Sequence, residues 1–446
     1  MREKEFLPQV ESALGVKALN PMQRRMLDVV SEGRDIVLLS PTGSGKTLAF
    51  VLPMLKLLKP STGRIQAVVI APSRELVLQI GGIIRRVARG VRCVEVYGGH
   101  KVEDEVNSLK VTPDVVVGTP GRLLDHLNRR NVDLWPVRIC VLDEFDKTLE
   151  LGFEHEVSRL MAALKNVSRV ILTSATQAEG YPEYIKLNDP LTLNYLGENK
   201  ELQTRLKVFA CRTDSKDKLE SLLRLLYLLA RQGGGVLDKT IVFVNHRESA
   251  ERVCGYLRKH GAGAVMYHGA LDQREREKAL ALFIAGARNV LVSTDLGARG
   301  LDIEGVKHVV HYHQPLTEQA FVHRNGRTAR VEALGAAYLM LGPDERPAGY
   351  VHPDDTLELV ECIADVTLDT GKDSLYISAG KREKLSKGDI LGWLVKDMGV
   401  DGRQVGAITV GDHYALVTLP AEEARRIASV SRNHRIKGEK RPVHLL

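Results

Sequence analysis

The stretch DIVLLSPTGSGKTLAF, residues 35–50, decides the fold. Its apolar run Ile36–Leu39 is bounded by polar residues, which is typical of a short buried strand. The run leads directly into a glycine loop, and Lys46 stands at the start of an amphipathic helix. Gly43 and Gly45 let the backbone N–H groups of such a loop point at a phosphate beside the helix N-terminus. Strand, glycine loop and helix in this order predict an α/β fold with a phosphate site at the end of the strand.

The side chains of this loop have the chemistry that a nucleoside triphosphate requires. Lys46 would reach the terminal phosphates, and the hydroxyl of Thr47 would hold Mg²⁺. Ser40 stands where the strict form of the pattern has glycine. An ordinary glycine turn before a helix is the alternative, but the strand and helix on either side favour a nucleotide site. The predicted phosphate-binding residues are Thr42, Gly43, Ser44, Gly45, Lys46 and Thr47.

A second stretch, RICVLDEFDKTLELGF at residues 138–153, ends an apolar run in three carboxylates. Carboxylates packed this closely repel one another unless a cation or hydrogen bonds offset the repulsion, and an exposed acidic turn is the alternative. In phosphate-loop proteins an Asp at the end of another strand binds the Mg²⁺ of the nucleotide, which favours Asp143 as a metal ligand with Thr47. Glu144 could then accept a proton from the attacking water, so Lys46, Asp143 and Glu144 are the predicted catalytic groups. Asp146 is better placed to bond a neighbouring segment.

Short apolar runs alternate with helix-length amphipathic stretches along most of the chain. The runs of the first half are DIVLLS, QAVVIAP, RCVEVYG, DVVVGTP, ICVLDEF and RVILTSAT. A polar connector follows, and the pattern restarts with LKVFAC, TIVFVN, AVMYHG, NVLVSTD, HVVHYH and GAAYLML. Runs that are apolar nearly throughout are typical of parallel sheets covered on both faces. We therefore predict two α/β lobes, residues 1–196 and 206–358, and a smaller α+β domain at 371–446.

Composition narrows the class of protein. The chain has 446 residues, of which 44% are hydrophobic and 27% charged, as in ordinary globular proteins. Its five cysteines form no CxxC pair, which argues against structural zinc or disulfides and predicts a reducing cytoplasmic environment. There is no signal-peptide core and no apolar run near the roughly 20 residues of a membrane span. We expect a cytoplasmic monomer with no membrane partner and no metal beyond Mg²⁺.

Charge is spread unevenly over the chain. The formal net charge is +7, and residues 371–446 contain 14 Lys and Arg against 9 Asp and Glu, a local balance of +5. A small basic unit on a nearly neutral body predicts a phosphate-backbone partner, although many basic tails serve only solubility.

Further motifs make the whole chain resemble one family. SAT at 174–176, STDLGARGLD at 293–302 and HRNGRTAR at 323–330 follow the glycine loop and the acidic cluster in order. In this order the motifs resemble the DEAD-box RNA helicases. The resemblance implies two RecA-like lobes that close on ATP and RNA, and local strand separation rather than travel along a duplex.

The resemblance also implies roles for residues around the nucleotide. Gln23 of NPMQ would hydrogen-bond the adenine, on which Phe6 would stack, and Asp302 would reach the ribose. Arg327 and Arg330 would be arginine fingers that act on the γ-phosphate. Taken alone, surface ion-pair arginines would be the better interpretation, but their place within HRNGRTAR favours the fingers. The residues that would couple the phosphate site to lobe geometry are Asp146, Ser174 and Thr176.

RNA contacts are implied for APSREL, Gly98–Gly99 and TPGR in the first lobe, and for HGALDQRER and STD in the second. Small and hydroxyl residues let a phosphate chain approach backbone N–H groups, while arginines add charge, so such contacts fix the backbone without reading bases. The candidates are Ser73, Arg74, Gly99, Thr119, Gly121, Arg122, Gln273, Arg276 and Thr294.

Three positions depart from the family pattern without removing a catalytic group. Phe145 replaces the usual Ala of the acidic tetrapeptide, and we expect it to need extra room beside the glycine loop. Leu19–Asn20 stand where Pro-Thr is usual, and Asn325 occupies a usually apolar position.

The C-terminal stretch has the order β, helix, β, β, helix, β, which fits an RRM-like sheet. AGKREKLSKGDILG at 379–392 and HRIKGEKR at 434–441 resemble the RNA-binding domain of DbpA-type helicases, which in bacteria target large-subunit ribosomal RNA. Tyr376 and Tyr414 could stack on bases or could be packed strand tyrosines, and both interpretations stay open. The basic RNA-binding candidates, which could also be solvated loop charge, are Lys381, Arg382, Lys384, Arg435 and Lys437.

The leading hypothesis is an ATP-dependent RNA helicase that takes part in large ribosomal subunit assembly through 23S rRNA or its precursor particle. A general cold-shock or RNA-decay helicase and a non-catalytic, ATP-dependent RNA clamp are the alternatives.

Overall fold

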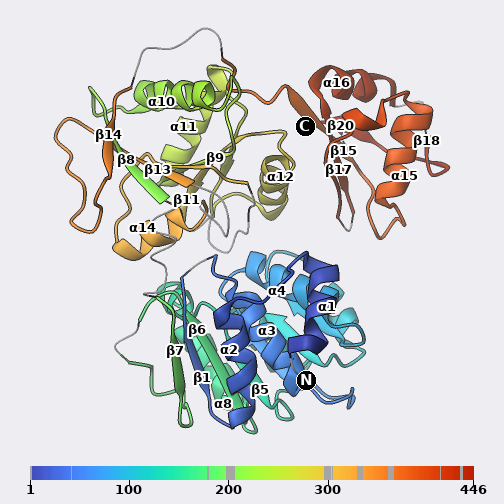
Figure 1. Ribbon diagram of the computed structural model, residues 1–446. Coiled ribbons are helices and arrows are strands. Elements are labelled where there is room, and N and C mark those ends of the chain that lie inside the picture. The colour runs from blue at the N-terminus through green and yellow to red at the C-terminus, as the bar shows by residue number, and fades with distance from the viewer. Residues whose placement is uncertain are drawn as a thin grey trace. The chain divides into compact units, whose positions relative to one another are not determined.

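The computed structural model describes residues 3–41, 43–177, 180–196, 206–295, 303, 305–328, 335–359, 366–411, 413–431 and 435–446, without the side chains of residues 3–6 and 273. The chain forms two compact units that divide near residue 204, and each is described by itself. The first unit contains a seven-stranded sheet with its helices, called the first lobe. The second unit contains another seven-stranded sheet, called the second lobe, and a four-stranded sheet, called the C-terminal domain (Figure 1).

The first lobe is built on a wholly parallel sheet in the order β3-β4-β2-β5-β6-β1-β7. Its strands are β1 (Ile36–Leu39), β2 (Ala67–Ile70), β3 (Cys93–Val96), β4 (Val115–Gly118), β5 (Ile139–Leu142), β6 (Arg169–Ser174) and β7 (Leu191–Asn194). Every residue of the central strands is buried, because successive side chains alternate between two covered faces.

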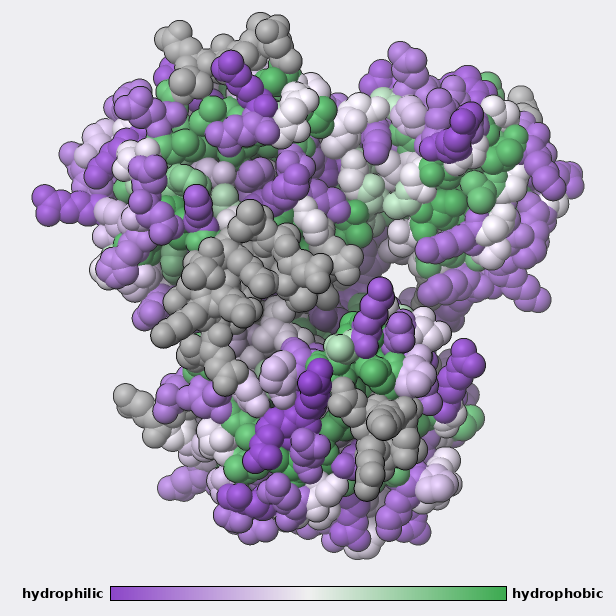
Figure 2. Space-filling view, in the orientation of Figure 1, coloured by the Kyte–Doolittle hydropathy of each residue, from purple (hydrophilic) through white to green (hydrophobic). Residues whose placement is uncertain are grey.

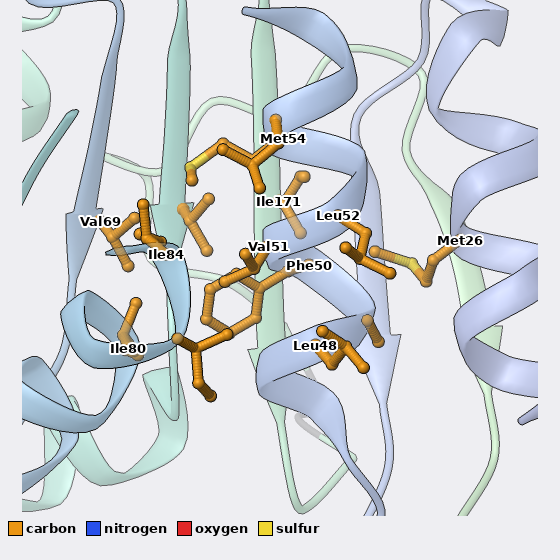
Figure 3. Close-up of a cluster of buried hydrophobic side chains, with 14 of the residues drawn as sticks. Met26, Leu48, Phe50, Val51, Leu52, Met54, Val69, Ile80, Ile84 and Ile171 are labelled. Carbon is orange, nitrogen blue, oxygen red and sulfur yellow. The ribbon is translucent and has the colours of Figure 1, made fainter. Parts of the chain in front are cut away.

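A separate hydrophobic core lies on each face of this sheet. One face packs against α1 (Glu3–Leu14), α2 (Pro21–Val29), α3 (Lys46–Leu57) and α4 (Arg74–Val87). The other packs against α5 (Val102–Leu109), α6 (Pro120–Asn128), α7 (Phe145–Glu150) and α8 (Glu154–Ala163). Figure 3 shows the first of these cores, in which Phe50 of α3 lies among side chains that include Val69 of β2 and Ile80 of α4. The helix that begins at the glycine loop is therefore anchored by its apolar side chains.

The second lobe repeats this plan with the order β10-β11-β9-β12-β13-β8-β14, again wholly parallel. Its strands are β8 (Leu206–Arg212), β9 (Thr240–Val244), β10 (Ala264–Tyr267), β11 (Val290–Thr294), β12 (His308–His311), β13 (Gly335–Leu341) and β14 (Asp355–Leu357). Its helices include α10 (Leu219–Gln232), α11 (Arg247–Lys259), α12 (Gln273–Ile284) and α14 (Glu318–Asn325). Buried leucines of α10 and the apolar face of α11 pack on one side of the sheet.

The C-terminal domain has an antiparallel sheet in the order β16-β17-β15-β20. Its elements are β15 (Lys372–Ile377), α15 (Lys387–Gly392), β16 (Ile408–Val410), β17 (Ala415–Pro420), α16 (Ala421–Val430), the hairpin β18 (Arg435–Ile436) and β19 (Glu439–Lys440), and β20 (Val443–Leu445). Leu375 and Ile377 pack with Trp393 in one core beneath the helices. The predicted fold class, two parallel α/β lobes and a small α+β domain, is confirmed, and the strands of each of these three sheets lie within one predicted range.

On the face shown in Figure 2, hydrophilic side chains cover most of the described surface, and hydrophobic areas are scattered between them. No helix among the described residues is both long enough and apolar enough to span a membrane.

Candidate active site

The glycine loop is closed by its own hydroxyl and ammonium groups. Gly43 and Gly45 have φ values of 79° and 86°, in the region that favours glycine. The Lys46 ammonium is buried and donates to the carbonyl O of Ser40 at 2.5 Å. The Ser40 hydroxyl donates to Ser44 Oγ at 2.7 Å, and Ser44 Oγ donates to the Pro41 carbonyl. The serine that departs from the strict pattern thus ties the loop together.

Helix α2 supports the loop from outside. Asn20 caps α2, accepting the N–H of Gln23, while the Gln23 side chain accepts the N–H of Asn20. The Asn20 amide also donates to the Ser44 carbonyl at 2.9 Å, and the Gln23 amide donates to the Gly45 carbonyl at 3.2 Å. The φ of 86° at Gly45 is strained for any other residue, and a Cβ added there would lie 2.6 Å from Gln23 Nε2, so the Gln23 amide would have to move. The departure at Asn20 therefore adds a donor that holds the loop.

The acidic cluster begins where β5 ends. Asp143 is 2% exposed and accepts a hydrogen bond from the Thr173 hydroxyl at 2.5 Å. Burial raises the pKa of its carboxyl, while the Thr173 hydrogen bond and the Lys46 ammonium oppose the shift. Glu144 has φ 45° and ψ 52°, a left-handed conformation that is uncommon for a non-glycine residue, and its N–H donates to the same Thr173 hydroxyl. Such strain occurs mostly at functional sites.

The third carboxylate contacts the SAT motif. Asp146 Oδ2 accepts a hydrogen bond from the Thr176 hydroxyl at 3.0 Å, and the Ser174 hydroxyl donates to the Thr176 carbonyl at 2.6 Å. The Ser40 N–H in turn donates to the Ser174 carbonyl at 3.0 Å. One chain of contacts therefore runs from the acidic cluster through the end of β6 to the glycine loop.

Phe145 lies elsewhere than the sequence suggested. Its side chain is 2% exposed and belongs to the core beneath α6 and α8, 6.5 Å from the ring of Tyr181. Helix α3, which continues the glycine loop, packs on the opposite face of the sheet. The expectation that Phe145 needs extra room beside the loop is wrong, because the side chain turns into the other core.

The predicted RNA contacts of the first lobe gather around the end of β3. Ser73 caps α4 and accepts the N–H of Leu76, and the Arg74 guanidinium lies 4.7 Å from the centroid of the Tyr97 ring. Arg122 donates to the carbonyls of Tyr97 and His100, both at 3.1 Å. Gly99 has φ 95°, Thr119 precedes α6 as its N-cap, and Gly121 lies in the first turn of that helix. The three motifs are thus brought to one place.

One residue at this place was missed from the sequence. Glu105 of α5 is 3% exposed and accepts the N–H of Tyr97 at 2.7 Å. Its other oxygen lies 2.7 Å from His126 Nε2 and 3.3 Å from Arg122 Nε. A buried carboxylate is stable only when it is paired in this way. Glu105 therefore fixes both the glycine turn after β3 and the guanidinium of Arg122; its only signal in the sequence was an acid among the apolar positions of α5.

In the second lobe a buried arginine, also missed from the sequence, supports the predicted arginine finger. Arg324 is 1% exposed and makes two hydrogen bonds to Asp295, at 2.6 and 2.8 Å. It also donates to Asn245 Oδ1 and to the His313 carbonyl, each at 2.8 Å. The N–H of Arg327 donates to the Arg324 carbonyl at 3.2 Å. The turn that carries Arg327 is therefore fixed to the ends of β9 and β11.

The same turn is held by a buried pair that explains the departure at position 325. His311 Nε2 lies 2.9 Å from Asn325 Oδ1, and both residues are at most 5% exposed. Burial lowers the pKa of His311 to about 3, so the ring is neutral and donates from Nε2. An apolar residue at position 325 would leave this donor unpaired, which accounts for the Asn.

The remaining candidates of the second lobe lie at the ends of β10 and β11. Arg276 donates to the carbonyls of Gly269 and Leu271, at 2.7 and 3.1 Å, and Thr294 ends β11 with 8% exposure. Five predicted positions fall on parts that the structure does not describe: the side chains of Phe6 and Gln273, and residues Thr42, Asp302 and Arg330.

In the C-terminal domain the two basic segments are adjacent. Lys437 Nζ donates to the Lys384 carbonyl at 2.8 Å and forms an ion pair with Asp389 at 3.0 Å. Arg435 and Lys381 are exposed beside them in sequence. The Ser386 and Lys437 hydrogen bonds hold the pKa of Asp389 at about 2, so it stays ionised and neutralises part of this charge. The segment of Lys381, Arg382 and Lys384 and the segment of Arg435 and Lys437 therefore form one basic surface, although they are more than 50 residues apart in the sequence.

The two tyrosines of this domain form a stack. Their ring centroids are 5.9 Å apart and their planes differ by 8°. Tyr376 lies between Leu375 and Ile377, which enter the core, so alternation along β15 places Tyr376 on the sheet face opposite to that core. Stacking on bases stays a prediction.

Three known domain families match consecutive parts of the chain. They are the DEAD/DEAH box helicase family at residues 20–183, the helicase conserved C-terminal domain at 217–332, and the DbpA RNA binding domain at 374–444.

One relative covers nearly the whole chain, and others cover about four fifths of it. The chain is similar to the ATP-dependent RNA helicase DbpA of Escherichia coli, with 33% identity over 97% of this chain and 95% of that protein. It is 32% identical to the DEAD-box ATP-dependent RNA helicase CshA of Bacillus subtilis over 80% of this chain and 72% of that one. The structure is similar to that of S. cerevisiae Dbp5 bound to RNA and ADP BeF3, with a TM-score of 0.69, 25% identity, and coverage of 80% and 94%.

These matches show that the chain belongs to the DEAD-box family of ATP-dependent RNA helicases, enzymes that hydrolyse ATP on RNA. Within that family it is of the DbpA type, because a domain that matches the DbpA RNA binding domain follows the two helicase domains. The family and the enzyme class predicted from the sequence are confirmed.

Proposed function

We propose that this helicase acts in assembly of the large ribosomal subunit, as a cytoplasmic monomer that is directed to 23S rRNA or its precursor particle by the C-terminal domain. The observation that carries the proposal is the basic surface of Lys381, Arg382, Lys384, Arg435 and Lys437, within the stretch that matches the DbpA RNA binding domain. Cationic side chains of this kind bind phosphate backbones with an affinity that falls as salt rises.

The proposal includes Mg²⁺ as the metal of the nucleotide. Mg²⁺ is usually bound through one or two carboxylates with phosphates and waters, and no group of three or more His, Cys, Asp or Glu in the described part of the chain could hold a metal by itself. The buried carboxylate of Asp143 and the hydroxyl of Thr47 fit this requirement. When bound, the ion would neutralise phosphate charge.

Each remaining residue of the site has a proposed task. The glycine loop presents N–H groups to the phosphates, with Lys46 adding charge, and Gln23 and Phe6 hold the adenine while Asp302 binds the ribose. Glu144 accepts the proton of the attacking water. Arg327 and Arg330 stabilise the charge of the transferred phosphoryl group.

Coupling of hydrolysis to RNA is proposed to pass through the contacts of Asp146, Ser174 and Thr176. In the lobes, the RNA backbone is proposed to contact residues near the ends of β2, β3, β4, β10 and β11: Ser73, Arg74, Gly99, Thr119, Gly121, Arg122, Gln273, Arg276 and Thr294. These contacts read no bases, so the choice of RNA falls to the C-terminal domain.

The target is tested by crosslinking the full-length protein to cellular RNA and sequencing the captured fragments. We expect a peak in the large-subunit rRNA that is lost on combining Lys384→Glu with Lys437→Glu. The matched control is Lys396→Glu, an exposed lysine of the same domain outside the basic surface, which should keep the peak. Scattered messenger RNA without a ribosomal peak would contradict the proposal and favour a general cold-shock or RNA-decay helicase.

The non-catalytic clamp is separated from the enzyme by ATP turnover. We expect RNA to stimulate hydrolysis by the wild type but not by Glu144→Gln. Equal rates in the two proteins would favour the clamp.

A further inference from the structure

A pocket lies on the first lobe at the amino ends of the sheet strands, whereas the glycine loop lies at their carboxyl ends. It has a volume of about 660 Å³ and is lined by residues at the start of β2, β5 and β6. The glycine loop, Asp143 and Ser174 all lie at the carboxyl ends of strands of the same sheet. Since β5 is four residues long and each residue of a strand rises about 3.3 Å, its two ends lie about 10 Å apart. This pocket is therefore distinct from the active site.

The rim of the pocket presents a tryptophan. Trp135 is 60% exposed, whereas its neighbours Leu134 and Val137 are at most 1% exposed. The backbone N–H of Trp135 donates to Asp133 Oδ1 at 2.9 Å, and its backbone carbonyl accepts a hydrogen bond from the side-chain amide of Asn166 at 2.9 Å. The backbone is thus held on both sides while the ring stays in solvent. A fixed backbone with an exposed indole is a suitable surface for stacking.

The lining is cationic. It includes Lys59, Arg64, Arg138 and Arg169, and it contains no Asp or Glu. Arg138 is exposed and donates to the Asn166 carbonyl at 3.2 Å, so it lies on the same side of the turn as Trp135. The carboxylate of Asp133 is bonded to the Trp135 backbone and is not part of the lining. An aromatic ring beside a lining of several cations favours an anionic ligand that has a flat apolar part.

A buried guanidinium gives independent support. Arg169, at the start of β6, is 8% exposed and lines the pocket. It donates to the Arg34 carbonyl, but among the described residues it forms no ion pair and its Nε has no hydrogen-bond partner. Most buried arginines are paired with a carboxylate, because an unpaired buried charge is costly. A ligand anion would supply the missing partner.

We propose that this pocket binds a nucleotide of an RNA strand, with its base on Trp135 and its phosphate near Arg169 and Arg138. Aromatic rings that stack on bases and cations that contact phosphates are the recurring elements of sites for single-stranded nucleic acid. The site would bind a part of the RNA other than the part that contacts the carboxyl ends of the β-strands. It is a second, sequence-tolerant contact of the first lobe.

An acidic peptide is the competing occupant. It would pair with the cations, but it offers no large planar group for an exposed indole that lies outside the apolar core. Membership of a family of RNA helicases also favours RNA.

The two tryptophans of the chain make the site measurable in the full-length protein. Trp135 is exposed and Trp393 is 3% exposed, so the emission that disappears in Trp135→Phe belongs to the pocket. This difference signal is titrated, without ATP, with a single-stranded oligouridylate, with uridine monophosphate and with polyglutamate. We expect oligouridylate to quench it at the lowest concentration and the mononucleotide at a higher one, while polyglutamate leaves it unchanged.

Charge reversal at Arg64 and Arg138 together should raise the oligouridylate concentration for half-quenching by about tenfold and should flatten its salt dependence. The matched control Arg159→Glu reverses an exposed arginine of α8 that does not line the pocket and should leave the titration unchanged.

No quenching of Trp135 by RNA, or quenching by polyglutamate at similar concentrations, would overturn the proposal; the second result would indicate a protein partner. RNA-stimulated ATP hydrolysis by Trp135→Phe should match the wild type, so failure of this site leaves the proposed function unaffected.

Discussion

The two lobes have one topology and opposite charge at corresponding places. Both sheets have seven parallel strands, and the order of the second repeats that of the first strand for strand. Where β5 ends, the first lobe collects Asp143, Glu144 and Asp146. The counterpart of β5 in the second lobe is β12, which is followed by α14. This helix carries Arg324, bonded to Asp295 after β11, and Arg327 lies in the turn that follows it. One scaffold therefore carries two kinds of chemistry, and the difference lies in the loops.

The means of support differ as well. Hydroxyl groups hold the carboxylates of the first lobe, namely those of Thr173 and Thr176. Charged and amide side chains hold the arginine turn of the second lobe, namely Asp295, Asn245 and Asn325. A hydroxyl that donates to a carboxylate leaves the negative charge available to a cation. The guanidinium of Arg324, in contrast, is buried and already bonded to Asp295, Asn245 and the His313 carbonyl. Arg324 thus holds the turn that carries Arg327.

The largest effect is expected from Arg327→Ala. If this side chain stabilises the charge of the transferred phosphoryl group, its loss should lower RNA-stimulated kcat by about 10³–10⁵, the range for arginine fingers. RNA affinity, measured by anisotropy, should change little. Arg327→Lys keeps the charge without the guanidinium fork and should recover only part of the rate; full activity in the Ala variant would show that the two lobes do not share the chemistry.

Removing the Arg324 side chain, which holds the arginine turn, should lower the stability of the second lobe. Arg324→Ala leaves the partly buried Asp295 without its partner and should lower the free energy of unfolding of the second lobe by about 3–5 kcal/mol. The control is Lys216→Ala, which breaks the exposed pair with Asp344 and should cost about 0–1 kcal/mol. Urea unfolding followed by circular dichroism measures both, and equal losses would contradict a buried clamp.

The first lobe has its own stability test in Phe145→Ala. This change restores the usual tetrapeptide of the family, yet it removes a ring from the core beneath α6 and α8. We expect a loss of about 3–5 kcal/mol in the first lobe, as for other buried Phe→Ala changes. Hydrolysis per folded molecule should stay near that of the wild type. A large fall in kcat without loss of stability would place Phe145 in the site after all.

The smallest effect is a difference in acid sensitivity. Burial lowers the pKa of His308 to about 4, of His311 to about 3 and of His313 to about 4. Below about pH 6.5 the unfolded chain binds protons at these rings that the folded lobe does not bind, so stability falls as pH decreases. For the fully buried His311 the slope is about 1.4 kcal/mol per pH unit.

The test compares thermal unfolding of the wild type and His311→Asn between pH 7 and 4.5. The variant lacks this titration and should lose stability less steeply with decreasing pH. Parallel curves would show that His311 is protonated in the folded lobe.

The order of the elements could be predicted because the information is local. The glycine loop, the acidic cluster and the β-α-β-β-α-β order of the C-terminal domain each lie within one short stretch of sequence. Supports formed between distant residues could not be predicted. Arg324 and Asn245 are 79 positions apart, and Glu105 and His126 are 21 apart. The direction of Phe145 was also missed, since a sequence does not state which face of a sheet a side chain at the end of a strand will enter.

The proposed function requires that the acid of the first lobe and the arginine of the second act on one phosphate. A double-mutant cycle of Glu144→Gln and Arg327→Ala, read out as single-turnover ATP hydrolysis with saturating RNA, tests it most directly. Groups that act in one transition state give non-additive losses, so we predict that the double variant is about as slow as the slower single variant. If the two losses instead multiply, the residues work independently and the account is contradicted.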